Sequence, residues 1–509
     1  MAKSTVLRQP QRRARNVAGA LFILSFFVIY YSSGRFGKPS PIETPSHSRL
    51  SVHPHPPPKP LMSPHYHSGP VDCDVDLELI GSFAPASTVL YSRWDIEVEQ
   101  TEEFDNFSKR LDVPIPNFTP LDIGSGEARR SFGECSPDVK ITAPRPVPVN
   151  ASHLLFGLAT SLERLYESLD AIAHWAGGTQ ARVFAVVEYG SLKSAVKQKA
   201  AELDVDLTLL ESTQEVLDRY ILLTRILLEH RDHATQWGVI IDDDTFFPSM
   251  QGLVKHLATY DATQPQYVGA LTEDVNRISL TGYIAYGGAG IFLSLPLLEE
   301  LDKYHDECAE LTEFGDKRIS QCIYLYTDTK FTWDRTLHQL DFYQTDGSGF
   351  YESGRSLPLS LHHYKSEEWF PVDIIGMSKV ASVCGDDCQL HRWRISDSSE
   401  WFFVNGFSII HHSHPIEDER GMEQTWDPSS WAREEGWAYS LGPLRPVDEG
   451  KIALRLRHAS VERDGSVRQI YVYNPEDSDL EYSDPDSDPG DRDAPYVHEV
   501  VWRLAPRTR

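Results

Sequence analysis

The sequence lacks three features that would place it in common classes of protein. It has no basic excess: 48 Lys and Arg against 75 Asp and Glu give a net charge of −27, so nucleic acid is a poor partner. No GxGxxG or Walker-type glycine loop follows the first strand of its α/β region, so the dinucleotide-binding and P-loop classes lose support. The closely spaced cysteines Cys384 and Cys388 have no second paired motif, which argues against a zinc site.

Charge is also absent from residues 17–33 (VAGALFILSFFVIYYSS), which follow a basic segment. As a helix they would span about 25 Å, enough for the thin membranes of the early secretory pathway. The basic flank predicts a cytoplasmic tail over 1–16 and a lumenal chain beyond the anchor. A cleaved signal peptide is the alternative, but Tyr30 and Tyr31 do not match its small-residue cleavage pattern. We therefore predict a single-pass type II protein of the Golgi or ER membrane.

Two segments have a composition that does not build a core. Residues 34–70 are rich in Pro, Ser and His and predict an extended stem before an N-terminal lumenal segment over 71–149. Residues 476–493 (EDSDLEYSDPDSDPGDRD) carry nine acidic residues and one Arg, which predicts a loosely held acidic loop. Three Asn-x-Ser/Thr triplets agree with a lumenal location as glycosylation acceptors, at Asn106, Asn117 and Asn150.

Six cysteines are an even number in an oxidising compartment, which makes three disulfides plausible. Cys308 and Cys322 lie on successive expected helices, and a bridge would hold the two helices together. Cys384 and Cys388 would close a tight loop. The remaining candidates are Cys73 and Cys135.

The chain alternates between strand and helix patterns over 150–380, which predicts an α/β domain with a mostly parallel sheet and helices on both faces. Beyond it, apolar alternation around Asn405-Gly406 and Asp464-Gly465 predicts a β-rich C-terminal extension over 381–509. The expected strands are 153–160, 181–189, 205–212 and 237–241, and the expected helices are 161–178, 191–203 and 213 to about 234.

The strand at 237–241 ends directly in three consecutive carboxylates, Asp242, Asp243 and Asp244. The carboxyl edge of an α/β sheet is where ligands bind, and adjacent carboxylates repel one another unless a positive group lies among them. Hard oxygen ligands in so tight a cluster favour Mg²⁺ or Mn²⁺, with diphosphate oxygens completing the shell. A solvated acidic turn is the alternative.

A second segment, Tyr286 to Gly290 (YGGAG), concentrates glycine before an apolar strand. Glycine lets the backbone pass close to a ligand, although the same residues could form a tight bend. The residues of interest are Gly287, Gly288, Ala289 and Gly290.

Six blocks, in order, carry a resemblance to a known family: HLLFGLATSLERL, WGVIIDDDTFF, YGGAGIFLS, FGDKRISQCIY, LHQLDFY and LSLHHYKSEEWFP. The chain resembles the fringe-like β-1,3-glycosyltransferases, the core-1 galactosyltransferase and fringe group of family 31, and looks closest to its fungal and plant branch. The resemblance covers about residues 153–375 and implies a GT-A fold, a UDP-sugar donor and Mn²⁺ or Mg²⁺.

The resemblance also implies roles for residues at the metal. Asp244 corresponds to the metal ligand, with Asp242 near the metal and Asp243 near the ribose, and the glycine segment borders the donor. His362 corresponds to a second metal ligand, with His363 as the alternative if the alignment slips by one. Because neighbouring strand residues face opposite sides, we expect only one of them to reach the metal.

Asp316 corresponds to the acidic position before the last helix of the family, which implies a general base. A carboxylate within hydrogen-bond reach assists attack by a sugar hydroxyl. Animal members carry paired acids here, whereas this chain has Lys317 next, and a helix N-cap is the alternative role. Trp333 and Asp341 are candidates for the acceptor side.

The sequence therefore predicts a metal-dependent inverting glycosyltransferase. It would move a hexose or N-acetylhexosamine from a UDP-sugar to a glycan or glycoprotein, in a β-1,3 linkage. The alternatives are a catalytically silent lumenal chaperone or scaffold with the same fold, or a lectin-like module centred on the β-rich tail.

Overall fold

The structure is a computed structural model that describes residues 72–506 apart from 85, 135–137, 314, 343–344, 366–368, 427–435 and 476–493. The expected cytoplasmic tail, anchor and stem (1–70) and the acidic loop (476–493) lie outside the described residues. Within those residues, no helix is long and apolar enough to cross a membrane.

A seven-stranded sheet, in the order β13-β11-β12-β10-β7-β8-β9, forms the centre of the α/β region. Only β12 runs antiparallel to its neighbours, so the predicted mostly parallel sheet is confirmed. The central strands β7 and β10 are buried at every position, which explains their continuous apolar runs. The strands are β7 (Leu154–Ala159), β8 (Arg182–Val187), β9 (Asp206–Glu211), β10 (Trp237–Ile241), β11 (Tyr267–Gly269), β12 (Ile291–Ser294) and β13 (Phe331–Trp333).

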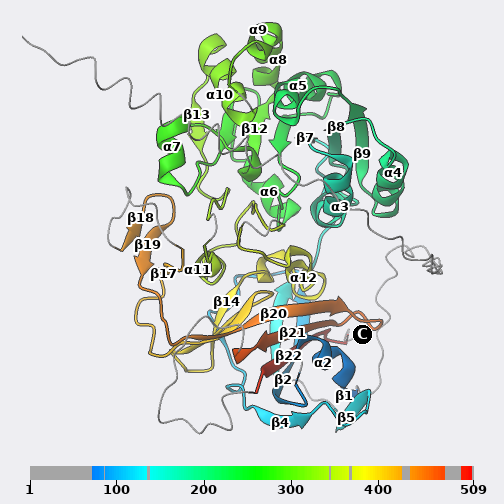
Figure 1. The fold of residues 1–509 in the computed structure, drawn as a ribbon, viewed down its shortest axis with the longest axis vertical. Coiled ribbons are helices and arrows are strands. Elements are labelled where there is room, and N and C mark those ends of the chain that lie inside the picture. The colour runs from blue at the N-terminus through cyan, green and yellow to red at the C-terminus, as the bar shows by residue number, and fades with distance from the viewer. Residues whose placement is uncertain are drawn as a thin grey trace, which may run out of the picture. The chain divides into compact units, whose positions relative to one another are not determined.

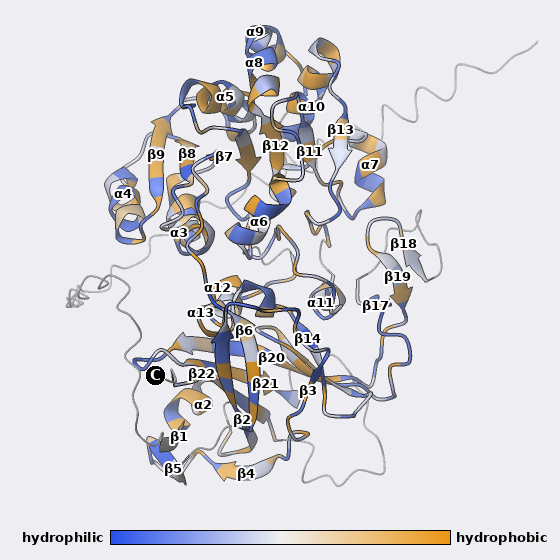
Figure 2. Cartoon of the chain, turned by 180° about the vertical axis from the view of Figure 1, so that it is seen from behind, coloured by the Kyte–Doolittle hydropathy of each residue, from blue (hydrophilic) through white to orange (hydrophobic). Residues whose placement is uncertain are grey.

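Helices pack on both faces of this sheet, as predicted. Alternate residues of β7 belong to different cores: Phe156 packs in the core that contains Leu165 of α3, and Leu155 in the core that contains Leu223 of α5. Figure 1 shows α3 and α4 beside β8 and β9, and Figure 2 shows hydrophobic strands such as β7 and β12 next to helices of mixed hydropathy. The helices are α3 (Leu162–Ala176), α4 (Lys193–Glu202), α5 (Val216–Glu229), α6 (Met250–Leu257), α7 (Val275–Thr281), α8 (Leu295–Asp302), α9 (His305–Ala309) and α10 (Gly315–Tyr326).

A ten-stranded sheet combines strands from before residue 150 with strands from after residue 390. The predicted hairpins at Gly406 and Gly465 are confirmed, and both glycines have positive φ, 78° and 84°. β2, from the segment 71–149, pairs in parallel with the C-terminal β22, a long-range pairing that local sequence patterns do not reveal. The strands are β2 (Thr88–Thr101), β3 (Arg110–Leu111), β4 (Thr119–Asp122), β6 (Val139–Pro144), β14 (Arg392–Ile395), β15 (Trp401–Val404), β16 (Ser408–His411), β20 (Ile452–Val461), β21 (Val467–Tyr473) and β22 (Tyr496–Leu504).

Smaller elements complete the described chain. β1 and β5 form a two-stranded sheet, and β17, β19 and β18 form a three-stranded sheet. These elements and the short helices are β1 (Asp72–Asp76), α2 (Leu77–Phe83), β5 (Arg129–Glu134), α11 (Ser348–Tyr351), α12 (Ile374–Ser378), α13 (Ala381–Cys384), β17 (Met422–Glu423), β18 (Trp437–Ala438) and β19 (Gly442–Arg445).

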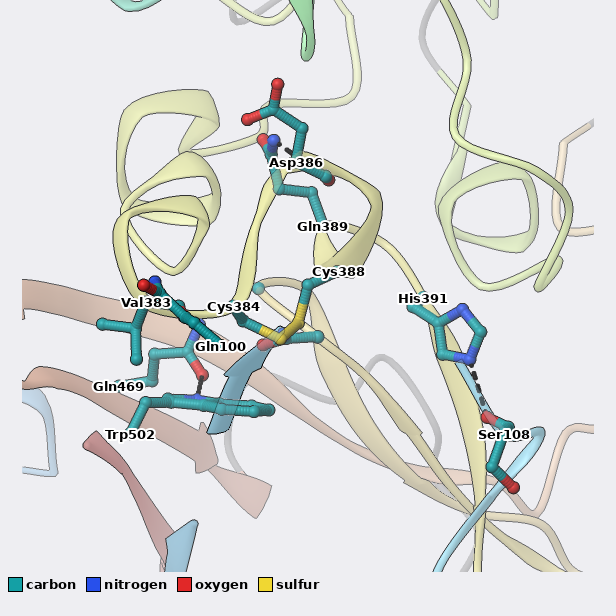
Figure 3. Close-up of a disulfide and its surroundings, with 12 residues drawn as sticks. Gln100, Ser108, Val383, Cys384, Asp386, Cys388, Gln389, His391, Gln469 and Trp502 are labelled. Carbon is teal, nitrogen blue, oxygen red and sulfur yellow. Dashed lines mark hydrogen bonds between the residues drawn. A yellow bond between two sulfur atoms is a disulfide. The ribbon is translucent and has the colours of Figure 1, made fainter. Parts of the chain in front are cut away.

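Two of the predicted disulfides are present. Cys308 of α9 is bonded to Cys322 of α10, which holds this helix pair together. Cys384 is bonded to Cys388 in a tight loop, drawn in Figure 3 near Trp502 of the ten-stranded sheet. Cys135 lies outside the described residues, so a third disulfide involving the remaining candidates Cys73 and Cys135 stays a prediction.

The loop closed by Cys384 and Cys388 contacts the chain just after the acidic turn. Ser249 Oγ donates a hydrogen bond to Asp386 at 2.6 Å, and the Gln389 amide donates to the Pro248 carbonyl oxygen at 2.9 Å. Because Ser249 is also the N-cap of α6, these contacts tie the end of the acidic segment to the β-rich part of the chain.

Candidate active site

The three aspartates lie at the carboxyl edge of the seven-stranded sheet, directly after β10. Thr245 holds the turn: its Oγ1 accepts from the Asp242 amide and donates to the Gly288 carbonyl oxygen at 3.0 Å. Phe246 then pairs with Leu361 through two main-chain hydrogen bonds of 2.8 Å. This bridge brings residue 362 next to residue 244, so the two predicted metal-binding segments meet although they are far apart in sequence.

The ligand atoms of Asp244, His362 and His363 all lie within 4.8 Å of one another. His362 Nε2 is 2.9 Å from Asp244 Oδ1 and 3.4 Å from Asp242 Oδ2. Its Nδ1 lies 3.1 Å from the Gln339 carbonyl oxygen, which accepts a hydrogen bond from that nitrogen and leaves Nε2 facing the carboxylates. A mixed set of carboxylate oxygen and imidazole nitrogen fits a divalent transition metal such as Mn²⁺ better than Mg²⁺, which prefers oxygen alone.

His363 differs from the expectation that the two histidines face opposite sides. Its φ is +62°, so the chain is not extended at His363, and the centres of the His362 and His363 rings lie 3.7 Å apart. His363 Nδ1 is 4.0 Å from Asp244 Oδ2, and the ring stacks on Trp369. Both histidines therefore face Asp244, and both could bind the same ion.

The charges in this cluster are strongly coupled. Burial opposes ionisation of Asp244, but His362, His363 and Arg164 more than offset it and hold the pKa of that carboxyl well below its usual range. Burial also opposes charge on His362, yet Asp244 and Asp242 raise its pKa well above the usual value. The imidazolium thus supplies the positive charge that adjacent carboxylates require, in the position where a metal ion would supply it.

Asp243 binds Arg164, whereas its neighbours Asp242 and Asp244 lie against His362. Its buried carboxylate accepts from Arg164 Nε at 2.7 Å and Nη2 at 2.5 Å, and also from Thr160 Oγ1. Lys365 Nζ lies 3.9 Å away. The sequence analysis did not predict a role for Arg164 or Lys365. Arg164 lies in the first turn of α3, directly after β7, and this position places it at the same carboxyl edge of the sheet as the aspartates. The expected contact of Asp243 with a ribose stays a prediction.

The glycine segment passes directly against this cluster. A Cβ at Gly288 would lie 2.2 Å from the His362 ring, and a Cβ at Gly287 would lie 3.1 Å from Asp242 Oδ1. The Ala289 amide donates to Gln339 Oε1 at 3.0 Å, and the Ala289 carbonyl oxygen accepts from Ser360 Oγ. Close approach of the backbone is therefore the structural reason for glycine here.

Asp316 lies in the first turn of α10, which begins at Gly315. The Gly287 amide donates to Asp316 Oδ2 at 3.3 Å. Burial and the nearby charge of Asp242 raise the pKa of Asp316 to about 7. A carboxylate with this pKa suits a general base that works near neutral pH.

Gln339 and Asp341, of which only Asp341 has a predicted role, as an acceptor-side candidate, support the two histidines. Gln339 contacts both His362 and the glycine segment, as described above. Asp341 accepts from His363 Nε2 at 2.9 Å and from Thr272 Oγ1 at 2.5 Å, so it fixes the His363 ring. Trp333, the other acceptor-side candidate, lies with its ring 6.1 Å from that of Tyr439. The predicted glycosylation acceptors Asn106, Asn117 and Asn150 are all exposed.

One family model matches the sequence, and it covers a small part of the chain. This model, described as "Protein of unknown function, DUF604", matches residues 278–383. It does not name the fringe-like family, so membership of that family stays a prediction. No curated protein matches the sequence.

Several solved structures are similar to the chain. The galactosyltransferase LgtC, in complex with donor and acceptor sugar analogues, is 11% identical with a TM-score of 0.26, over 38% of this chain and 77% of LgtC. The glycosyltransferase GlyE of Streptococcus pneumoniae is 10% identical with a TM-score of 0.26, over 37% of this chain and 46% of GlyE. S. aureus TarS in complex with UDP-GlcNAc is 12% identical with a TM-score of 0.25, over 36% of this chain and 56% of that one. Because the sequence identities and TM-scores are this low, these similarities carry no functional argument, and the assignment of a function rests on the residues of the site.

Proposed function

We propose that this protein is a metal-dependent inverting glycosyltransferase with a GT-A domain. It would transfer a hexose or N-acetylhexosamine from a UDP-sugar to a glycan or glycoprotein, in a β-1,3 linkage. One observation carries the proposal: Asp244, His362 and His363 bring their ligand atoms together at the carboxyl edge of the sheet, and the adjoining glycine segment contacts Asp316. The donor class and the linkage come from the sequence resemblance.

The residues divide into two groups with different roles. Asp244 and His362, with His363 and Asp242, would hold the Mn²⁺ ion, which when bound neutralises charge on the departing diphosphate. Asp316 would hold the acceptor hydroxyl and accept its proton during attack on the anomeric carbon. Attack opposite to the leaving group inverts the configuration, so an α-linked donor gives a β-linked product.

The proposal includes a location. The apolar residues 17–33 with their basic flank support a type II protein whose catalytic part lies in the Golgi or ER lumen. The two disulfides and the exposed Asn-x-Ser/Thr triplets agree with such a compartment.

The proposal is tested by incubating the full-length purified chain with a panel of UDP-sugars and measuring released UDP. We expect hydrolysis of at least one donor with Mn²⁺ and none with a chelator. Asp244→Ala should remove this activity, whereas Asp206→Asn, at an exposed aspartate of β9, should not. A silent chaperone or a lectin-like protein predicts no Mn²⁺-dependent hydrolysis of any donor, and that result would refute the proposal.

A further inference from the structure

Three aromatic side chains and two arginines gather beside the candidate active site, from three separate parts of the chain. β13 ends in Trp333, and the Arg335 guanidinium lies 5.5 Å from the centre of the Trp333 ring. Tyr439 follows β18 and lies 6.1 Å from the same ring. The members of this aromatic–arginine cluster are Trp333, Arg335, Arg355, Trp437 and Tyr439.

Gly442 connects the other two members of the cluster. A Cβ built on it would lie 3.7 Å from Arg355 Nη2 and 3.9 Å from Trp437 Cη2, so both side chains lie next to the backbone of Gly442. Trp437 is 45% exposed, and both arginines are exposed. The cluster therefore offers an open surface on which a ligand could contact rings and guanidinium groups together.

Among the described residues, the two arginines have no acidic partner within ion-pair distance. They remain unpaired there although acidic residues outnumber basic ones in the full sequence by 75 to 48. Although part of the Arg355 side chain is exposed, burial of the remainder and the charge of Arg335 lower its pKa, so the two cations repel each other. A bound anion would relieve this repulsion, and guanidinium groups bind carboxylate and phosphate through paired hydrogen bonds.

A chain of hydrogen bonds joins the cluster to the proposed metal ligands. The Tyr439 hydroxyl donates to the Thr272 carbonyl oxygen, Thr272 Oγ1 donates to Asp341, and Asp341 accepts from His363. β11 and β13 are parallel neighbours, so the residues that follow them lie at the same sheet edge as the three aspartates. A ligand on the cluster would thus lie next to the reacting groups rather than on a remote face.

We propose that the aromatic–arginine cluster is an acceptor subsite for a sugar that carries an anionic group. The aromatic rings would pack against the apolar face of the sugar, while Arg335 and Arg355 would bind the anion. This inference rests on the proposed glycosyltransferase function and adds the acceptor class to it. The anionic group could be a uronic-acid carboxylate or a sugar phosphate, which share this chemistry.

The test is calorimetric titration of the full-length protein, without donor, with three probes: a disaccharide ending in glucuronate, its neutral glucose counterpart, and that counterpart phosphorylated at O6. We expect at least one anionic probe to bind about tenfold or more tightly than the neutral one. Tighter binding of the glucuronate probe would identify a carboxylate as the group recognised, and tighter binding of the O6-phosphorylated probe would identify a phosphate. Equal affinities for all three probes, or no binding of any, would overturn the inference.

Variants separate the subsite from the metal site. Arg335→Ala and Arg355→Ala should each weaken binding of the preferred anionic probe by about tenfold and leave the neutral probe unchanged. Arg463→Ala, at an exposed arginine between β20 and β21, is the matched control and should change neither. Mn²⁺-dependent UDP binding should stay at the wild-type level in all three variants. A failure of the proposed metal and donor site would therefore be distinguishable from a failure of anion recognition by the cluster. Wild-type affinity for the anionic probe in both cluster variants would also overturn the inference.

Discussion

Gly288 packs against His362 so closely that a Cβ on it would lie 2.2 Å from the imidazole ring. The Gly288 carbonyl oxygen also accepts from Thr245, the residue that holds the acidic turn. One backbone segment thus fixes the position of a proposed metal-binding histidine relative to the aspartates, and that histidine cannot keep its place if the segment gains a side chain.

Gly288→Ala should therefore weaken Mn²⁺-dependent UDP binding by about 10- to 100-fold, the usual effect of disturbing the surroundings of a metal ligand. The new methyl group must displace the His362 ring or the glycine segment. Gly81→Ala in α2 is the control, because its Cβ would meet only Ile123 at 3.8 Å. Titration calorimetry of both variants checks the prediction; wild-type affinity in the Gly288 variant would show that His362 is not a ligand.

Asp316→Asn should reduce transfer by about 10²-fold or more with donor affinity near normal, because the amide cannot accept the proton of the acceptor. The wild-type rate should rise with pH to a plateau, since the base works only when deprotonated and the pKa of Asp316 is raised to about 7. The rates are measured at saturating donor and Mn²⁺ between pH 5.5 and 8.5. A near-normal rate with the same pH profile in the variant would remove Asp316 from the mechanism, and Asp274 or Asp341 would then be examined as the base.

Asp243→Asn should act mainly on stability. The substitution breaks the paired hydrogen bonds between this buried carboxylate and Arg164, and we expect a loss of about 1–3 kcal/mol in the free energy of unfolding. The measurement is urea unfolding in the presence of a chelator, so that metal binding does not contribute. Unchanged stability together with weakened UDP binding would instead assign Asp243 to the donor, as the sequence resemblance implies.

The sequence predicts those parts of the site that depend only on residues close together along the chain. The buried strand before Asp242 and the glycine segment at residue 287 are found where the pattern placed them, because continuous apolar runs and glycine clusters are local signals. The arrangement of the two histidines was not predictable, because it depends on the positive φ of His363, a conformation that few non-glycine residues adopt.

Contacts between distant segments were also missed. Arg164 and Asp243 are 79 residues apart, and Tyr91 and Glu499, which share a hydrogen bond in the ten-stranded sheet, are 408 apart. A single sequence shows hydrophobic periodicity within each strand but not which strands become neighbours. For this reason the sequence predicts 71–149 and 381–509 as separate segments, although their strands form one sheet.

The two disulfides should differ in their effect on stability. Replacing Cys308 and Cys322 together by Ser should lower the free energy of unfolding by about 3 kcal/mol, because the bridge closes a loop of 14 residues. The same change at Cys384 and Cys388, which are only four residues apart, should cost less through loop entropy. Denaturant unfolding of both double variants gives the comparison. A larger loss at the shorter loop would mean that its contacts with Ser249 and Pro248 matter more than chain entropy.

The most direct test of the account is calorimetric titration of UDP into the full-length protein with and without Mn²⁺, for the wild type, Asp244→Ala and the control Asp206→Asn. We predict binding by the wild type and the control only when Mn²⁺ is present, and no Mn²⁺-dependent binding by the Asp244 variant, whose melting temperature should show that it remains folded. Unchanged Mn²⁺-dependent affinity in Asp244→Ala would contradict the account, because it would place the metal and the donor away from Asp244, His362 and His363.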